Sequence, residues 1–277
     1  ERTHLAKSTG RLVLENIYHG RKMASVAPGT IKKLLVLKQV PKPVNHSGGM
    51  EPLTIGGTFT LAQILGTVPV EADGSAYMEL PALQSVFFVA LDGKDLAVKR
   101  MHSFLTLQPG ETMSCVGCHE QRNEAPHEPP ADMLALQRPP SRLEKSPDIP
   151  DVMDFPRDIQ PILDKHCVEC HNPDRRDGGV ELVGDKTPMY TISYWTMQTR
   201  GLVADGRNRE TSNYEPYQIG SSASRLMNFI DGSHYDAKLT EHEKELVRLW
   251  LDTSATYPGT YSALGCGSYP IAATTPA

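Results

Sequence analysis

Cys115-Val116-Gly117-Cys118-His119 recurs later in the chain as Cys167-Val168-Glu169-Cys170-His171. A Cys-x-x-Cys-His run is the attachment signature of a c-type haem, in which two thiols bond to the porphyrin and the histidine ligates the iron. Five cysteines and ten histidines among 277 residues predict only about 0.003 copies by chance. The two copies therefore predict two covalently bound haem c groups, with His119 and His171 as iron ligands.

The two cysteine pairs also have other interpretations. A Cys-x-x-Cys pair can form a disulfide or a redox-active dithiol, and two such pairs can bind one zinc ion. A zinc site would leave both following histidines as coincidences. The haem interpretation is therefore favoured over zinc or a disulfide.

Composition limits the class of protein. A chain of 277 residues with 39% hydrophobic and 22% charged residues can form one large domain or two ordinary ones. The formal net charge of −5 argues against a nucleic-acid partner. No run of about 18 apolar residues occurs, so we expect no membrane span.

The start of the chain bears on where the protein is found. Thioether attachment of haem takes place outside the cytoplasm in bacteria, so the motifs imply export. The sequence from Glu1 has neither a basic nor an apolar signal-peptide region, so any signal peptide is expected to have been removed. This start also suits a piece of a longer chain. Cys266 is the odd cysteine, and a small residue in a turn is favoured over a ligand or an intermolecular bridge.

Residues 1–122 have the pattern of a β-rich domain. Asp73-Gly74 lies between two strand-like runs and predicts a hairpin, and Asp92-Gly93 predicts a second turn. Short strands at turn spacing predict a sandwich-like domain with the first motif on its last edge. The strand-like runs are 11–18, 31–37, 64–71, 76–81, 86–91, 97–101 and 103–107.

Two further segments follow the β-rich domain. Residues 123–154 contain seven prolines and many charges, which predicts an extended linker. From residue 155 the pattern becomes helical and suits a small cytochrome c-like domain at 155–277. We therefore predict an α+β multidomain chain, in which a β-rich haem-bearing domain precedes a mostly helical cytochrome c domain.

Two helices are expected in this last domain. The first has one apolar face that runs directly into Cys167. That face consists of Ile159, Ile162, Leu163 and His166. The second begins at a capping box, Thr240 to Glu243. Its predicted buried stripe is Leu246, Leu249 and Trp250.

The sixth iron ligand sets the function of each haem, because histidine or methionine saturates the iron and an open position can bind a substrate. For the second haem, loop residue His234 is favoured and Met227 comes second, and the other candidates are Met189, Met197 and His242. His166 is too close to Cys167 to reach the opposite haem face, so packing or hydrogen bonding is expected. For the first haem an open iron, a ligand from a partner protein and five residues stay as alternatives: His46, Met101, His102, Met113 and His127.

Several longer phrases resemble the hydrazine synthase alpha-subunit family. Residues 67–77, Gln108-Pro109-Gly110-Glu111 and residues 115–120 resemble its middle domain. The second motif, with residues 233–236 and 257–261, resembles its C-terminal cytochrome domain. The resemblance covers most of the chain. It implies a β-rich domain with one c-type haem, followed by a cytochrome c domain whose haem has two histidine ligands.

Two features depart from that family. Its large N-terminal β-propeller is absent, so we expect a fragment, a processed product or a stand-alone relative. In the anammox enzyme, a tyrosine four residues past the motif histidine ligates the first iron, and Asn123 stands at that position here. Asparagine cannot supply a phenolate, which argues against hydrazine formation.

The sequence thus predicts a dihaem c-type cytochrome that transfers electrons to redox partners or other cytochrome subunits, within a larger multihaem assembly. The alternative is a haem-dependent redox enzyme that acts on a small nitrogen or oxygen compound at an open first haem. Electron transfer is favoured, because no convergent acid and base residues lie near His119 in the sequence. No catalytic residue is predicted. The expected location is the periplasm, an anammoxosome-like compartment or the extracellular space.

Overall fold

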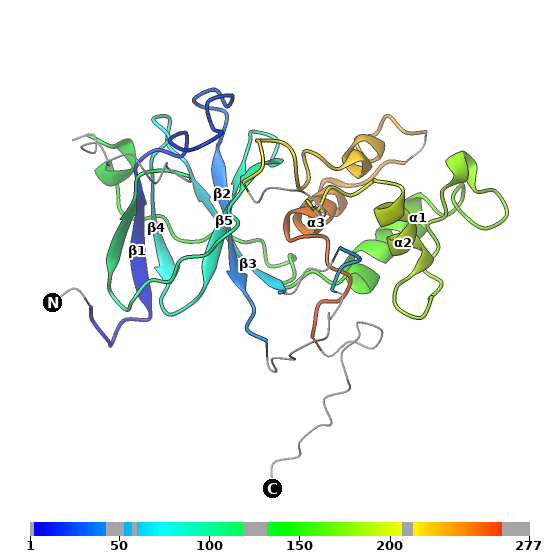
Figure 1. The fold of residues 1–277 in the computed structure, drawn as a ribbon, viewed down its shortest axis with the longest axis horizontal. Coiled ribbons are helices and arrows are strands. Elements are labelled where there is room, and N and C mark those ends of the chain that lie inside the picture. The colour runs from blue at the N-terminus through cyan, green and yellow to red at the C-terminus, as the bar shows by residue number, and fades with distance from the viewer. Residues whose placement is uncertain are drawn as a thin grey trace, which may run out of the picture. The chain divides into compact units, whose positions relative to one another are not determined.

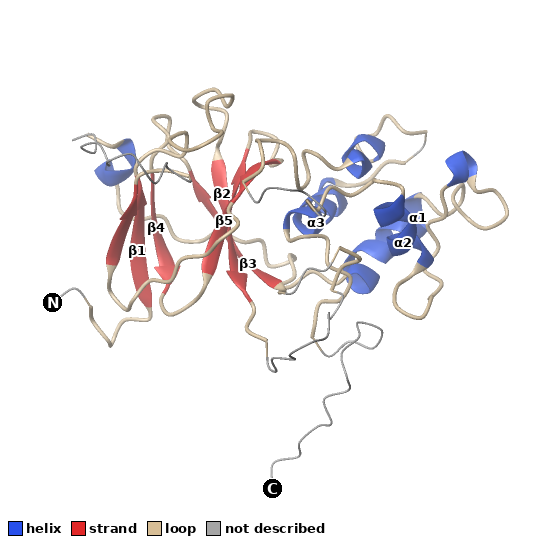
Figure 2. Ribbon diagram, in the orientation of Figure 1, coloured by secondary structure: helices blue, strands red, loops and turns tan. Residues whose placement is uncertain are grey.

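The structure is a computed structural model and describes residues 3–42, 53–56, 60–118, 132–206, 213–235 and 237–261. These residues form a mixed α+β chain with two compact units. The first unit comprises the described residues within Glu1–Gln39, Ile64–Ile149 and Glu210–Ile219, and the second comprises those within Val40–Gln63, Pro150–Arg209 and Gly220–Ala277. The strands belong almost entirely to the first unit and the α-helices to the second (Figure 2).

β1 (Thr9–Leu14) is the central strand of a three-stranded sheet with the order β4-β1-β7 (Figure 1). It pairs antiparallel with β4 (Ala76–Pro81) and parallel with β7 (Thr112–Cys115). β4 alternates strictly between buried and half-buried residues, the pattern of a strand with one face on the core. The first motif begins on β7, so this sheet positions Cys115.

The second sheet has the order β3-β2-β5-β6. Its strands are β3 (Ala62–Pro69), β2 (Lys33–Gln39), β5 (Val86–Leu91) and β6 (Ala97–Arg100). β5 pairs antiparallel with both β2 and β6. β2 and β5 are buried along most of their length, as expected of central strands that are covered on both faces.

The two predicted Asp-Gly turns have different outcomes. Asp92-Gly93 lies in the loop that joins the paired strands β5 and β6. Asp73-Gly74 also forms a turn, in which the Gly74 amide donates to the Glu71 carbonyl at 2.9 Å. Its predicted hairpin is wrong, because β3 pairs with β2 whereas β4 pairs with β1. This turn passes the chain from one sheet to the other.

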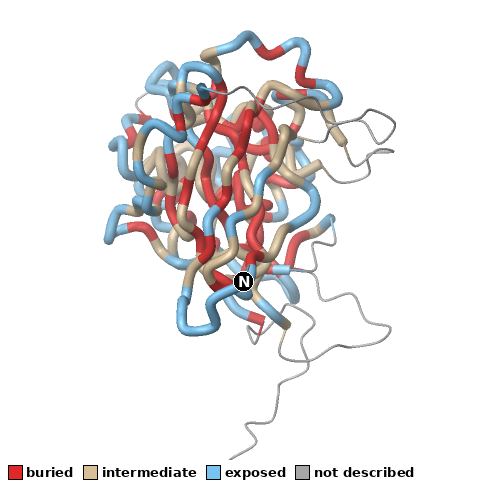
Figure 3. Tube along the Cα trace, turned by 90° about the vertical axis from the view of Figure 1, so that its left-hand side faces the viewer, coloured by how far each residue is buried: buried red, intermediate tan, exposed pale blue. Residues whose placement is uncertain are grey.

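The core of the first unit lies between the two sheets and gives it the sandwich-like character that the strand pattern predicts. Figure 3 shows buried residues concentrated along the strands. Aliphatic side chains from β1, β2, β4 and β5 form one cluster, including Leu12, Leu14, Leu34, Val36, Met78, Leu80, Val86 and Ala90.

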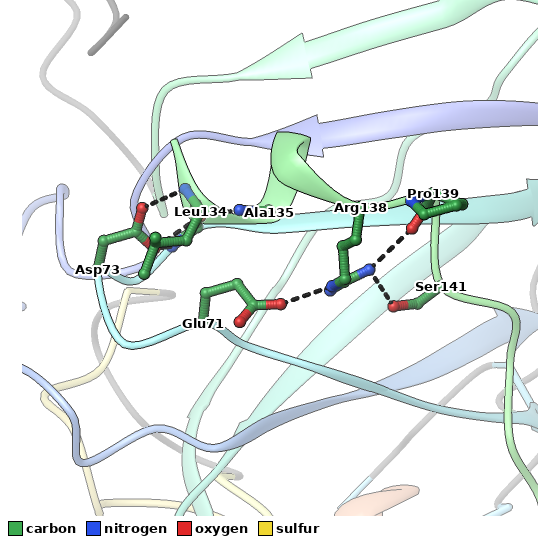
Figure 4. Close-up of polar contacts among 8 residues, drawn as sticks. Glu71, Asp73, Leu134, Ala135, Arg138, Pro139 and Ser141 are labelled. Carbon is green, nitrogen blue, oxygen red and sulfur yellow. Dashed lines mark hydrogen bonds and ion pairs between the residues drawn. The ribbon is translucent and has the colours of Figure 1, made fainter. Parts of the chain in front are cut away.

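The described part of the proline-rich segment predicted as a linker is residues 132–154. Residues 132–149 belong to the first unit and residues 150–154 to the second. A short turn, η1 (Leu134–Gln137), donates backbone N–H groups to Asp73 and Ser75 at 2.9 and 3.1 Å (Figure 4). Arg138 then bonds the Glu71 carboxylate at 2.7 Å. These polar contacts fix the segment against the turn that links the two sheets.

The second unit packs three helices around aromatic side chains. The helices are α1 (Gln160–His166), α2 (Ile192–Thr199) and α3 (Glu241–Asp252), with shorter turns η2 (Phe155–Ile159), η3 (Asp177–Gly179) and η4 (Arg225–Phe229). The ring of Phe155 lies 5.2 Å from those of both Tyr194 and Trp250, and all three are fully buried. Such a cluster can bury a large apolar area in a small unit.

The predicted ends and faces of the helices are mostly confirmed. The Thr240 hydroxyl accepts from the Glu243 amide, and the Glu243 carboxylate accepts from the Thr240 amide, so the capping box is present. Ile159, Ile162 and Leu163 are buried as predicted. The predicted stripe of α3 is right only for Trp250: Leu246 and Leu249 are half-buried, and the buried face contains Val247 and Leu251.

Candidate functional site

The first Cys-x-x-Cys pair is held by the segment that follows β1. Cys115 ends β7 opposite Leu14, and its carbonyl accepts from the Glu15 amide at 2.9 Å. The Cys118 amide donates to the His19 carbonyl at 2.7 Å. Backbone hydrogen bonds therefore hold the loop from Cys115 to Cys118 against the segment that follows β1.

Two glycines allow this close approach. A Cβ atom at Gly117 would lie 2.0 Å from the His19 carbonyl oxygen, and one at Gly20 would lie 1.7 Å from the Cys118 carbonyl oxygen. Both distances are far below van der Waals contact. Glycine is thus required at both positions for the loop to dock.

Both cysteines of this pair line a cavity of about 150 Å³ in the first unit. The walls come from both sheets and are mostly aliphatic, whereas the polar side chains are those of Lys99 and Ser103. An apolar enclosure beside two correctly spaced thiols suits the edge of a porphyrin. The apolar lining comprises Leu12, Leu14, Ile17, Leu34, Met78, Phe88, Ala90, Met101 and Leu105.

Lys99 is a site residue that the sequence analysis missed. It is only 5% exposed, and its ammonium group donates to Asn213 Oδ1 at 2.7 Å and to the Tyr214 carbonyl. Burial lowers the pKa of Lys99, against an opposing effect of Cys118. Burial raises the pKa of Cys118, and Lys99 opposes that change. Strand alternation was the available signal, because Lys99 shares a face with its cross-strand partner Ala90.

The candidate sixth ligands of the first motif are separated by the structure. Met101 lines the cavity, whereas Met113 is half-buried against the core of the first unit. His102 is exposed, with its ring 5.0 Å from that of Tyr214. His46, His127 and the motif residue His119 lie outside the described residues.

The second motif starts where α1 ends. The Cys167 amide donates to the Leu163 carbonyl at 2.8 Å, and the His171 amide donates to the Cys167 carbonyl at 3.0 Å. The Asn172 side chain donates to two carbonyls of the same turn, at 3.0 Å each. Burial, together with the neighbouring Cys170, raises the pKa of Cys167 to about 11. The thiol is therefore protonated at neutral pH.

His171 and His234 are brought together in the second unit. Their ring centroids lie 6.1 Å apart, and their planes differ by only 10°. Nδ1 of His171 is buried and has no hydrogen-bond partner among the described residues. A buried ring nitrogen of this kind calls for a missing partner, such as an ion or a water molecule. Two nearly parallel imidazoles, one of which has an unpaired buried nitrogen, are compatible with an iron held by two histidine ligands.

The other candidates for the second site lie in different surroundings. Met197 is fully buried, Met227 is half-buried in η4, and Met189 and His242 are exposed. His166 bonds Glu243 on α3 at 3.1 Å, as its predicted hydrogen-bonding role requires.

The donor set weighs against the zinc and disulfide interpretations within the described part of the chain. Cys115, Cys118, Cys167 and Cys170 are all free thiols. The described residues contain no group of three or more His, Cys, Asp or Glu side chains that could hold a metal ion.

Comparison with known proteins gives the relationship of the chain. Residues 29–120 match the family model of the hydrazine synthase alpha subunit middle domain. This stretch is similar to the middle domain of the hydrazine synthase alpha subunit. A structure of hydrazine synthase from Kuenenia stuttgartiensis has a similar fold, with a TM-score of 0.64 and 19% sequence identity over 92% of this chain. The present chain spans 44% of that hydrazine synthase chain. No curated protein matches the sequence.

The hydrazine synthase alpha-like match confirms the predicted resemblance and includes the first motif. The second motif, residues 167–171, lies outside the matched region. Every helix in the described part of the chain is too short or too polar to traverse a lipid bilayer.

Proposed function

We propose that the chain is a dihaem c-type cytochrome that transfers electrons. One haem is attached through Cys115 and Cys118 with His119 as ligand, and the other through Cys167 and Cys170 with His171 and His234 as ligands. Haem iron supplies one-electron redox chemistry when it is bound. The residues of the chain attach it, orient it and exclude water from it.

The proposal rests on the arrangement of the His171 and His234 imidazole rings. His171 and His234 would hold the iron of the second haem, which would supply one-electron redox chemistry there. Their ring centroids are 6.1 Å apart. Offset aromatic pairs also occur at this distance, but a simple ring pair gives no reason for the unpaired buried Nδ1 of His171. Two histidines that saturate an iron favour electron transfer over substrate binding.

A second candidate function rests on the first site. The cavity at Cys115 and Cys118 has space for a small molecule, and it contains one buried cation, Lys99. These features favour a redox enzyme that acts on a small nitrogen or oxygen compound at the first haem. In that case the second haem supplies or removes the electrons.

Partners and location follow from the same proposal. The matching family is described as an alpha subunit, which supports a role within a larger assembly of redox subunits. Covalent haem attachment supports an extracytoplasmic location.

Three measurements test the proposal. The intact mass should exceed that of the polypeptide by two haem groups, and the pyridine haemochrome spectrum should show the c-type band. A mass equal to that of the bare polypeptide would reject the proposal. The ferric spectrum with and without cyanide then separates the two functions. Two low-spin irons inert to cyanide indicate a carrier, and a high-spin iron that binds cyanide indicates an enzyme.

A further inference from the structure

A single carboxylate joins the end of α1 to the start of α3 in the second unit. Glu243 Oε1 accepts a hydrogen bond from Lys165 Nζ at 2.9 Å, and Glu243 Oε2 lies 3.1 Å from His166 Nε2. The same Oε2 accepts from the Thr240 amide at 2.8 Å. Only 14% of the Glu243 side chain is exposed. Hydrogen bonds to a charged carboxylate are stronger than those between neutral groups. These three contacts, here called the Glu243 junction, therefore hold the two helices together.

The α1 side of the Glu243 junction adjoins the second cysteine motif. Lys165 and His166 directly precede Cys167, the first cysteine of that motif. Cys167 caps the C-terminus of α1, and its carbonyl accepts from the His171 amide at 3.0 Å. The junction thus contacts the segment that carries one of the two nearly parallel histidines.

The α3 side of the junction anchors the loop that carries His234. Thr240, the N-cap of α3, lies six positions after His234. Between them Ala237 and Leu239 are buried, and the Ala237 amide donates to the His234 carbonyl at 3.1 Å. The loop residues next to His234 are exposed: Asp231, Gly232, Ser233 and Tyr235. Exposed loops are held mainly by the elements at their ends, and one of these elements is α3.

We propose that Glu243 is a positioning residue of the second haem site, which keeps His234 in place beside His171 by holding the start of α3 against the end of α1. The hydrogen bonds of the junction reach neither histidine, so Glu243 acts through the two segments that carry them. The inference rests on the proposed function, because it concerns the histidine that would ligate the second iron. It adds a residue that controls how readily His234 leaves that iron.

Cyanide binding to the ferric holoprotein at pH 7 measures how often His234 is released. A six-coordinate iron must lose a ligand before cyanide binds, so the rate at saturating cyanide equals the rate of release. His234→Ala identifies this phase of the reaction, because it removes the ligand that has to leave. Glu243→Gln should accelerate the phase by at least about tenfold, since it removes a charged acceptor that three donors share.

Glu241→Gln is the matched control for the carboxylate. Glu241 lies in the same first turn of α3 and is paired with Lys244 at 2.8 Å, but that contact stays within α3. Its rate of cyanide binding should equal that of the parent protein. Val247→Ala is the control for stability, because Val247 is buried on α3 and takes no part in the junction. It should lower the free energy of unfolding without changing the rate of release.

Lys165→Met is the second variant if Glu243→Gln does not fold. It removes one contact of the junction and leaves the capping box intact. It should also accelerate release, by a smaller factor because the Lys165 side chain is 60% exposed. An unchanged rate in Glu243→Gln, or an equal acceleration in Val247→Ala, would overturn the positioning role. Intact mass of the same samples counts the attached haems. Two haems with an unchanged rate reject this inference alone, whereas a bare polypeptide rejects the dihaem proposal as well.

Discussion

The imidazole planes of His171 and His234 lie within 10° of each other, although 63 positions separate the two residues in sequence. His171 follows α1, whereas His234 comes from the loop before α3. The edge of the His234 ring meets Phe229, with centroids 5.1 Å apart. The neighbouring Phe229 ring thus orients the His234 side chain. Such support is expected of a side chain that must present one nitrogen in a fixed direction.

His234→Ala should convert one of two low-spin haems to high spin while both stay covalently attached. The reason is that the variant removes a ligand but neither thioether bond. Ferric absorption spectra and intact mass check this outcome. Met227→Ala is the control and should leave the spectrum unchanged. If the parent protein shows a methionine-to-iron charge-transfer band that Met227→Ala abolishes, His234 is the wrong ligand.

Gly117→Ala should prevent the first cysteine loop from docking. Its Cβ would meet the His19 carbonyl oxygen at 2.0 Å, so backbone must move. We expect a loss of about 2–4 kcal/mol in the free energy of unfolding of the first unit and reduced haem attachment there. Gly93→Ala is a matched control, because its new Cβ would have only the Lys32 side chain nearby, at 3.9 Å. Similar losses in both variants would show that the close approach does not matter.

Arg138→Met should loosen the proline-rich segment. The guanidinium group joins the Glu71 carboxylate to Ser141, with both contacts at 2.7 Å. Because these groups are only partly buried, the expected loss is about 1 kcal/mol. Limited proteolysis should then cut within residues 132–149 faster than in the parent. Arg142→Met changes an exposed arginine of the same segment and should leave the cleavage rate unchanged.

Glu243 should make the second unit sensitive to acid. Burial would raise its pKa, but hydrogen bonds from Lys165, Thr240 and His166 lower it from 4.5 to about 2. A depressed carboxyl pKa contributes stability that is present above pH 4.5 and is lost as the pH falls towards 2. The shift corresponds to about 3 kcal/mol at most.

Denaturant unfolding of wild type and Glu243→Gln at pH 7 and pH 3 measures this contribution. The variant should be less stable at pH 7. The difference should shrink at pH 3, because the Glu243 carboxyl is then protonated in the unfolded state, with a pKa near 4.5, while it stays mostly ionised in the folded state. Glu245→Gln, also on α3, is the control and should show no such convergence. A constant difference between Glu243→Gln and wild type at both pH values would contradict the prediction.

Local and non-local features differed in how well the sequence predicted them. The two cysteine motifs, the capping box at Thr240 and the helix before Cys167 depend on neighbouring residues, so spacing alone revealed them. The strand that pairs with β4 could not be predicted from local spacing. Asp73-Gly74 specifies a turn, but pairing with β1 depends on which distant strand buries the same face.

In the candidate site, too, local features were predicted from the sequence and contacts between distant residues were not. Lys99 lies in an ordinary strand pattern, and only the folded chain reveals that Asn213, 114 residues later, accepts its hydrogen bond. The proline-rich segment was also misleading, because proline content predicts extended chain but does not say what that chain packs against. Its attachment depends on single polar contacts to Glu71, Asp73 and Ser75.

The parallel pairing of Leu14 with Cys115 joins one of the first strands of the chain to the last strand of the first unit. Contacts of such long sequence separation form late and raise the contact order, which slows folding. During synthesis from the N-terminus, about 100 further residues must be added after β1 before its partner β7 exists. Cys115, at the end of β7, is therefore undocked until β7 pairs with β1. The haem attachment proposed above would then meet an open segment before this pairing forms and a closed sheet after it.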